Sequence, residues 1–135
     1  MPAVKNISFP RKIRILLAED EQIYQRIIEK HVHDFDMQLT IANDGEQCLK
    51  EIDNRPYDVI LMDLIMPEFS GLEVAKAIRR KGIRTPIIAV TSNTWKEDEV
   101  SSFRSGMNDF LAKPFNAQKL ARKILYWSRK RSTRL

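Results

Sequence analysis

The chain has 135 residues, of which 43% are hydrophobic and 30% charged, and a formal net charge of +5. These values are typical of one globular domain that can bury a core without disulfide or metal support. No apolar run approaches the roughly 20 residues that span a bilayer, and no secretory signal is recognisable. A single cysteine, Cys48, excludes an internal disulfide and is expected to be a small apolar helix residue. We therefore expect a cytoplasmic protein with no membrane insertion.

The positive charge is concentrated at the C-terminal end of the chain. Seven Lys or Arg residues and no acidic residue follow Pro114, whereas the first 114 residues carry 16 basic and 18 acidic side chains. A basic segment can contact nucleic acid non-specifically, an anionic membrane or an acidic protein, although a solvated helix end is the simpler interpretation. No helix-turn-helix or aromatic-studded basic sheet is present, so sequence-specific nucleic-acid binding is not expected. The expected organisation is an extension (1–11), one folded domain (12–130) and a basic tail (131–135).

Short apolar strands alternate with amphipathic helices along the domain. We expect strands at residues 12–18, 37–42, 58–63, 86–91 and 109–112. Helices are expected at about 21–33, from 43–45 onward, from 70 to near 82, at about 94–105 and from about 116. The first of these helices has Ile23, Ile27 and Ile28 on one side, and the spacing of Thr94 and Glu97 predicts a capping box. Five unbroken apolar strands alternating with helices predict a doubly wound α/β fold with a parallel sheet buried on both faces.

Polar residues follow four of these strands, where sites form in open α/β sheets. They are Glu19, Asp20, Asp63, Thr91 and Lys113. Carboxylates packed together repel one another unless a cation lies among them, and an all-oxygen acidic site suits Mg²⁺ or Mn²⁺. A metal-bound carboxylate beside an ammonium group and a hydroxyl group is equipped to receive a phosphoryl group.

Together these residues resemble the response-regulator receiver domain of two-component signalling, over about residues 12–130. The motifs that carry the resemblance occur in the order of the family: Glu19-Asp20, Asp63 with Met66-Pro67 and Gly71, Thr91, Phe110, and Lys113-Pro114-Phe115. The resemblance implies a CheY-like, flavodoxin-like (βα)5 fold with strand order 2-1-3-4-5. It also implies a signalling protein rather than an enzyme, which catalyses only its own Mg²⁺-dependent phosphorylation and dephosphorylation.

The resemblance assigns roles to individual residues. Asp63 would be the phospho-acceptor, and the metal would be held by Asp20, Asp63, the backbone carbonyl of Ile65 and, through water, Glu19. Thr91 and Lys113 would bind the phosphoryl group, Phe110 would turn behind Thr91 as the switch, and the bond before Pro114 would be cis. Two positions would tune the phosphoryl lifetime: Ile65, which is apolar and offers no hydrogen bond to an attacking water, and Asn93, which could offer one.

The implied partners are a histidine kinase or a histidine phosphotransfer protein, which would donate the phosphoryl group. A downstream protein would bind the face formed by the helix at 94–105, the strand at 109–112 and the last helix, and phosphorylation could produce a homodimer. The chain is expected to be a stand-alone receiver. The alternatives are a receiver excised from a hybrid kinase or multidomain regulator, and a receiver-like binding module that works without phosphorylation.

An aspartate-nucleophile phosphatase of the haloacid-dehalogenase type is a further alternative. Enzymes of that type need a second acid two positions after the nucleophile, and Ile65 occupies this position after Asp63. This alternative is therefore weak.

Overall fold

The structure is a computed structural model that describes residues 11–92 and 96–132. In chain order its elements are β1 (Arg14–Ala18), α2 (Gln22–Asp34), β2 (Gln38–Ala42), α3 (Gly45–Asn54), β3 (Val59–Met62), α4 (Gly71–Arg80), β4 (Ile87–Thr91), α5 (Lys96–Arg104), β5 (Asp109–Ala112) and α6 (Ala117–Ser132). The predicted strands and helices are all present, and the ends that the sequence placed lie within about two residues of the observed ones.

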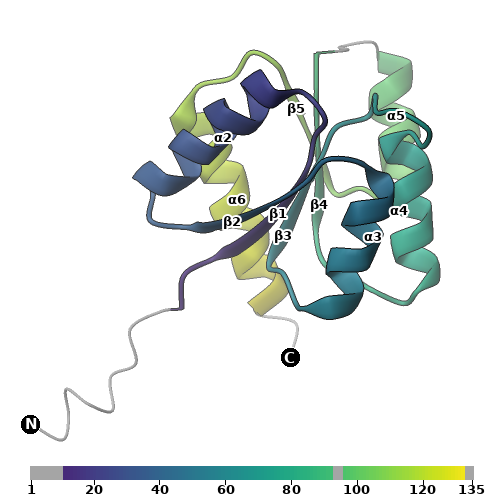
Figure 1. Cartoon of the computed structure of the whole chain (residues 1–135), viewed down its shortest axis with the longest axis horizontal. Coiled ribbons are helices and arrows are strands. Elements are labelled where there is room, and N and C mark those ends of the chain that lie inside the picture. Colours follow the sequence, from purple (N-terminus) through teal and green to yellow (C-terminus); the bar gives the residue numbers. More distant parts are fainter. Residues whose placement is uncertain (1–10, 93–95, 133–135) are drawn as a thin grey trace, which may run out of the picture.

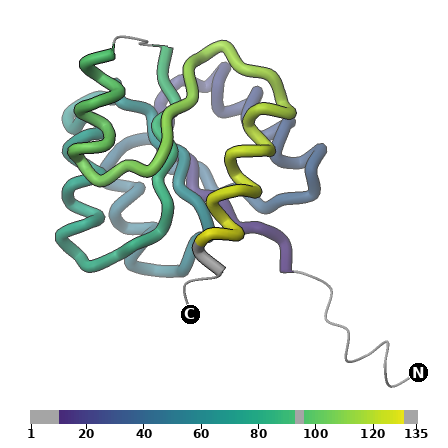
Figure 2. Tube along the Cα trace, turned by 180° about the vertical axis from the view of Figure 1, so that it is seen from behind, coloured from purple at the N-terminus to yellow at the C-terminus, as the bar shows by residue number. Residues whose placement is uncertain are grey.

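The five strands form one parallel sheet in the order β2-β1-β3-β4-β5, which confirms the predicted doubly wound topology. Helices α2 and α6 cover one face of the sheet, and α3, α4 and α5 cover the other (Figure 1; Figure 2 shows the same arrangement from behind). Because both faces are covered, β1, β3 and β4 are almost entirely buried, which explains their unbroken apolar sequences. No helix in the described ranges combines the length and the apolarity needed to cross a bilayer.

Each face of the sheet has its own hydrophobic cluster. The cluster under α2 and α6 contains Ile28, Val32, Leu120 and Ile124, whose side chains are at most 2% exposed. The cluster under α3 and α4 contains Cys48, and burial raises the pKa of its thiol to about 12. Cys48 is therefore an inert core residue, in agreement with the expected small apolar helix residue.

Local side-chain hydrogen bonds define where two helices begin. The Asp44 carboxylate accepts a hydrogen bond from the amide of Gln47 at 2.8 Å and so caps α3. At the start of α4, the Ser70 hydroxyl accepts from the Glu73 amide while the Glu73 carboxylate accepts from the Ser70 amide, which is a complete capping box. The capping box predicted at Thr94 involves residues outside those described.

The apolar side expected for the first helix is only partly buried. Ile28 is fully buried, but Ile23 is 69% exposed and Ile27 is 38% exposed. The core side of α2 is instead formed by Ile28 and Val32, one turn apart. Two isoleucines in the first half of this helix, Ile23 and Ile27, therefore face solvent.

Candidate functional site

The polar residues predicted to share one edge of the sheet do lie together. Strands β1 and β3 are in register with Ala18 opposite Met62, so the acids that follow them emerge at the same level. One carboxylate oxygen from each of Glu19, Asp20 and Asp63 lies within 4.8 Å of the other two. Glu19 and Asp63 are buried, whereas Asp20 is exposed. The carboxyl ends of parallel strands thus assemble an acidic group at the position expected for a ligand site in this type of sheet.

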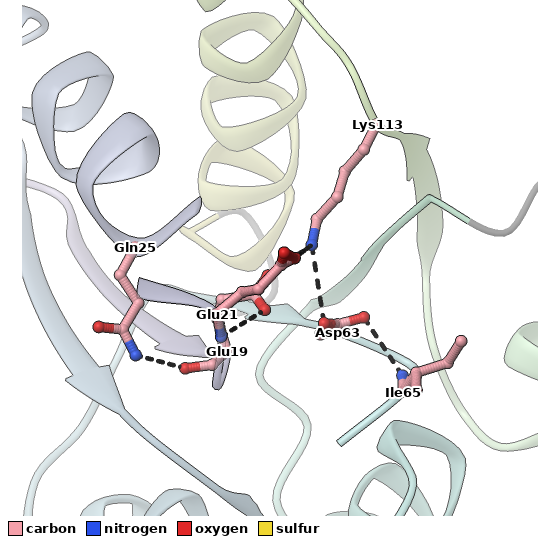
Figure 3. A network of polar contacts seen from close by, with 6 residues as sticks. All are labelled: Glu19, Glu21, Gln25, Asp63, Ile65 and Lys113. Atoms are coloured by element: carbon pink, nitrogen blue, oxygen red, sulfur yellow. Dashed lines mark hydrogen bonds and ion pairs between the residues drawn. The ribbon is translucent and has the colours of Figure 1, made fainter. Parts of the chain in front are cut away.

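Lys113 brings a positive charge into this acidic group. Its ammonium nitrogen is 2.7 Å from an oxygen of Glu19, 3.6 Å from one of Asp63 and 3.9 Å from one of Glu21. Figure 3 shows the ammonium group between the carboxylates of Glu19 and Asp63. The Lys113 side chain is only 3% exposed, so these ion pairs are weakly screened by solvent.

The electrostatic balance of the site is visible at Glu19, whose side chain is fully buried. Burial, assisted by the neighbouring Asp63 carboxyl, raises the pKa of Glu19 to about 7, although the Lys113 ammonium acts in the opposite direction. One lysine therefore does not offset the cost of packing these carboxylates together. The site would accept additional positive charge.

The loop after β3 is tied to the site by backbone hydrogen bonds. The Asp63 amide donates to the Ala18 carbonyl at 3.0 Å, and the Ile65 amide donates to an Asp63 carboxylate oxygen at 3.2 Å (Figure 3). The Gly71 amide, at the start of α4, donates to the Leu64 carbonyl at 2.9 Å. The side chain of Ile65 is 64% exposed and does not join the core, while its amide points toward the Asp63 carboxylate.

Strands β4 and β5 supply the remaining predicted residues. Thr91 is 1% exposed, and its carbonyl accepts a hydrogen bond from the Lys113 amide at 2.8 Å. The Lys113–Pro114 peptide bond is cis, as the resemblance to receiver domains implied. Phe110 is half-buried and packs against the cluster under α3 and α4. Asn93, the second residue predicted to tune the lifetime, lies outside the described residues.

Three residues of α2 and the segment before it belong to the site but were not singled out in the sequence. Gln25 donates to the Glu19 carbonyl at 2.6 Å and to the Asn43 side chain at 2.8 Å, which holds the β1 end against the β2 end. Glu21 is the third consecutive acid after β1, and Tyr24 places its ring 4.0 Å from the Lys113 ammonium. Their closeness to Glu19 and Asp20 in the sequence was the only signal available.

The donor set fits a hard divalent cation. Three carboxylates converge within 4.8 Å, and burial together with the neighbouring Asp63 carboxyl raises the pKa of Glu19, which disfavours its charged form unless a cation is added. Oxygen donors of this kind are those that Mg²⁺ prefers, with one or two carboxylates and several waters completing the shell. His31 and His33 contribute nothing here, because His31 packs near Phe115 and His33 is exposed.

Comparison with known proteins identifies the family to which this arrangement corresponds. Residues 15–125 match the family model described as the response regulator receiver domain. The receiver domain of the sensor histidine kinase PA1611 from Pseudomonas aeruginosa has a TM-score of 0.81 and 36% identity, covering 87% of this chain and 98% of that one. That structure is described with a magnesium ion coordinated in the active site cleft.

Curated relatives are longer than this chain. Transcription factor prr1 of Schizosaccharomyces pombe is 41% identical over 105 residues, which cover 78% of this chain and 20% of that protein. Response regulator ArlR of Staphylococcus epidermidis is 36% identical over 110 residues, which cover 82% of this chain and 50% of that protein. The chain thus spans between a fifth and a half of the length of these relatives.

Proposed function

This chain belongs to the family of response regulator receiver domains of two-component systems, and we propose that it takes a phosphoryl group from a phosphohistidine onto Asp63. The observation that carries the proposal is the arrangement around that carboxylate. Asp63 is only 6% exposed, its oxygen lies 3.6 Å from the Lys113 ammonium, and two further acids converge on it. A buried carboxylate at a strand end, surrounded by a cation and by metal-type donors, is suited to act as a nucleophile.

The proposed reaction exchanges one bond for another. An oxygen of Asp63 attacks phosphorus, a P–O bond forms, and the P–N bond to the donor imidazole breaks as the imidazole leaves with its electron pair. The Lys113 ammonium, placed beside Asp63, stabilises the charge on the phosphoryl oxygens, and Thr91 at the end of β4 supplies a hydroxyl group for another of them. The chain is thus a substrate that assists its own modification, and a signalling protein rather than an enzyme with turnover on other molecules.

Asp20, Asp63 and the Ile65 carbonyl are the proposed direct ligands of Mg²⁺, and Glu19 would bind it through water. When bound, the ion supplies charge neutralisation for the transferring phosphoryl group. Mn²⁺ prefers the same oxygen donors and should substitute in the assay described below.

The proposed response to phosphorylation lies at the α5-β5-α6 face. Phe110 of β5 packs against the core beside this face, and an inward movement of Thr91 toward a phosphoryl group would open space behind it for the ring. Because position 110 carries no tyrosine hydroxyl group, this switch must act through packing. The face would then change its affinity for a downstream protein, or for a second copy of the chain.

The proposal is tested by intact mass after incubation with acetyl phosphate, with and without Mg²⁺. We expect a single phosphoryl adduct that requires the divalent cation and is lost in Asp63→Asn, which keeps the size of the side chain but removes the nucleophile. If no adduct forms and Mg²⁺ does not bind, phospho-acceptance is wrong and the chain is a receiver-shaped interaction module.

Ile65 is expected to prolong the life of the phosphoryl group. Its amide contacts the Asp63 carboxylate, and its exposed apolar side chain cannot orient a water for attack. In Ile65→Asn, an amide that can hydrogen-bond such a water should speed loss of the adduct by roughly tenfold, the effect of about one good hydrogen bond. Decay is followed by intact mass after removal of the donor. Ile65→Leu, which remains apolar, is the matched control, and equal lifetimes for all three proteins would contradict the assignment.

Exposed Ile23 and Ile27 in α2 are the proposed contact for the phosphohistidine partner. Both side chains face solvent on α2, the helix that follows Asp20 and whose Tyr24 contacts Lys113. Ile23→Ala should slow phosphotransfer from a phosphorylated histidine phosphotransfer protein by roughly tenfold or more, because a buried isoleucine contributes about 1.5–3 kcal/mol to a contact.

The same Ile23→Ala variant should react with acetyl phosphate at the wild-type rate, because the small donor needs no docking surface. The matched control is Val100→Ala, which truncates another exposed aliphatic side chain but on α5, across the sheet. If Ile23→Ala reacts more slowly with both donors, Ile23 affects the phosphoryl-transfer step itself and is not specifically a contact for the donor protein.

The exchange is proposed to take place in the cytoplasm, where phosphohistidine donors and Mg²⁺ are available and the unpaired Cys48 thiol is compatible with reducing conditions. Because the longer relatives contain segments that this chain does not span, an output function such as DNA binding is not carried over from them. The proposed output is a change of protein partner.

A further inference from the structure

Tyr24 of α2 lies over the lysine of the proposed phosphorylation site. The Lys113 ammonium is 4.0 Å from the centroid of the Tyr24 ring, well within the distance of about 6 Å at which an aromatic face attracts a cation. The same nitrogen contacts Glu19 at 2.7 Å and Asp63 at 3.6 Å. Since the Lys113 side chain is 3% exposed, the ring and the carboxylates enclose it together.

The ring is held in place by the segment that carries the lysine. The centroids of Tyr24 and Phe115 are 6.3 Å apart with the rings tilted by 42°, and Phe115 also lies 6.4 Å from the ring of His31. Phe115 follows Lys113 by two residues and packs against the cluster under α2 and α6. The aromatic contact therefore fixes the ring and the ammonium group relative to each other through the same short loop.

We infer that Tyr24 is a positioning residue for phosphoryl transfer, whose ring holds the Lys113 ammonium beside Asp63 and shields it from water. The inference rests on the proposed phosphorylation of Asp63. An aromatic face attracts a cation less strongly than a carboxylate does, and it carries no net charge. Tyr24 can therefore confine the ammonium without adding a fourth negative group that would compete with the phosphoryl oxygens for it.

The test compares Tyr24→Leu, Tyr24→Met and Tyr24→Phe with the wild-type chain. The rate of adduct formation with acetyl phosphate and Mg²⁺ should fall by about three- to tenfold in the leucine and methionine variants and stay at the wild-type value in Tyr24→Phe, which keeps the ring face. Tyr24 is half-buried, so its substitution can also lower stability. The unfolding midpoint of each variant is therefore measured, and rates are compared only among variants that are folded under the assay conditions.

A spectroscopic measurement separates positioning from a general loss of structure. Protons on the terminal carbon of Lys113 should be shifted upfield by the ring current of Tyr24 in the wild type and in Tyr24→Phe. That shift should disappear in Tyr24→Leu, while core methyl signals of the cluster under α3 and α4 stay unchanged.

The possible results separate the inference about Tyr24 from the proposed phosphorylation of Asp63. A wild-type rate in Tyr24→Leu, an equal slowing in Tyr24→Phe, or an unchanged Lys113 proton shift in Tyr24→Leu would overturn the inference while leaving phosphorylation of Asp63 intact. A wild-type chain that acquires no phosphoryl group would instead overturn the proposed function, and the inference with it.

Discussion

Gly71→Ala is expected to destabilise the domain by about 2–3 kcal/mol and to slow phosphorylation of Asp63 at the same time. A β-carbon at position 71 would overlap the carbonyl oxygen of Asp63 and approach the Asp63 carbonyl carbon and the Leu64 α-carbon to 3.0 Å each. All three atoms belong to the backbone, so no side-chain rotation relieves the overlap. The first turn of α4 must move away from the loop that carries Asp63, the proposed acceptor.

That movement should also slow phosphorylation, because the first turn of α4 fixes the position of the loop after β3. The Gly71 amide donates to the Leu64 carbonyl at 2.9 Å, and the Ile65 amide beyond it contacts the Asp63 carboxylate. A displacement of this kind should cost roughly tenfold or more in the rate of adduct formation with acetyl phosphate. Stability is measured by urea unfolding and the rate by intact mass.

Gly82→Ala is the matched control for this prediction. Gly82 has φ of +80°, and no atom lies within 4 Å of the position that a β-carbon would take. An alanine there is therefore strained in its backbone conformation but overlaps no neighbouring atom. It should lower stability by about 1–2 kcal/mol and leave the phosphorylation rate unchanged, since it follows α4 at the opposite end of the helix. If Gly71→Ala is also phosphorylated at the wild-type rate, the close approach at position 71 serves folding alone.

Much of the fold and the composition of the site followed from the sequence, because both depend on short-range patterns. Unbroken apolar strands indicate a parallel sheet covered on both faces, and a parallel sheet gathers its carboxyl-end residues at one edge. Asp63 illustrates this: an acid at the end of an apolar run became interpretable once Glu19 and Lys113 were placed at neighbouring strand ends. The order of the elements therefore carried most of the information about the site.

The structure differs from the expectation where burial depends on packing between distant elements. Ile23 and Ile28 look alike in the periodicity of α2, yet one is 69% exposed and the other is fully buried. Tyr24 touches the site because the Lys113 side chain reaches it from the end of β5, and Gln25 touches it because α2 lies beside the end of β2. No local sequence pattern predicts either contact. Arg79 and Arg80 likewise look the same in the sequence, as two basic residues at the end of a helix. In the structure Arg79 is half-buried and hydrogen-bonded, whereas Arg80 is exposed.

Arg79→Met is expected to cost about 3–4 kcal/mol, a large part of the stability of a typical domain. The Arg79 guanidinium donates to the carbonyls of Gly106, Ile83 and Thr85 at 2.8–2.9 Å and to the Asn108 side-chain oxygen at 2.9 Å. One side chain of α4 thus joins the loop before β4 to the loop before β5. Methionine retains the unbranched apolar stem of arginine and lacks the guanidinium group, so its effect reports mainly the loss of these charged hydrogen bonds.

Arg79→Met should also weaken the sheet, because Asn108 links Arg79 to β4. The oxygen that accepts from Arg79 also accepts from the Ile87 amide at 2.9 Å, and the Asn108 amide donates to the Ile87 carbonyl at 2.7 Å. Losing the guanidinium should therefore loosen the start of both β4 and β5, and amide hydrogen exchange at Ile87 and Phe110 should accelerate. In urea the unfolding midpoint should fall by roughly 2 M.

Arg80→Met, which changes the exposed neighbour, is the matched control and should change the free energy of unfolding by less than about 0.5 kcal/mol. Equal effects of the two variants would show that the hydrogen bonds of Arg79 contribute nothing specific.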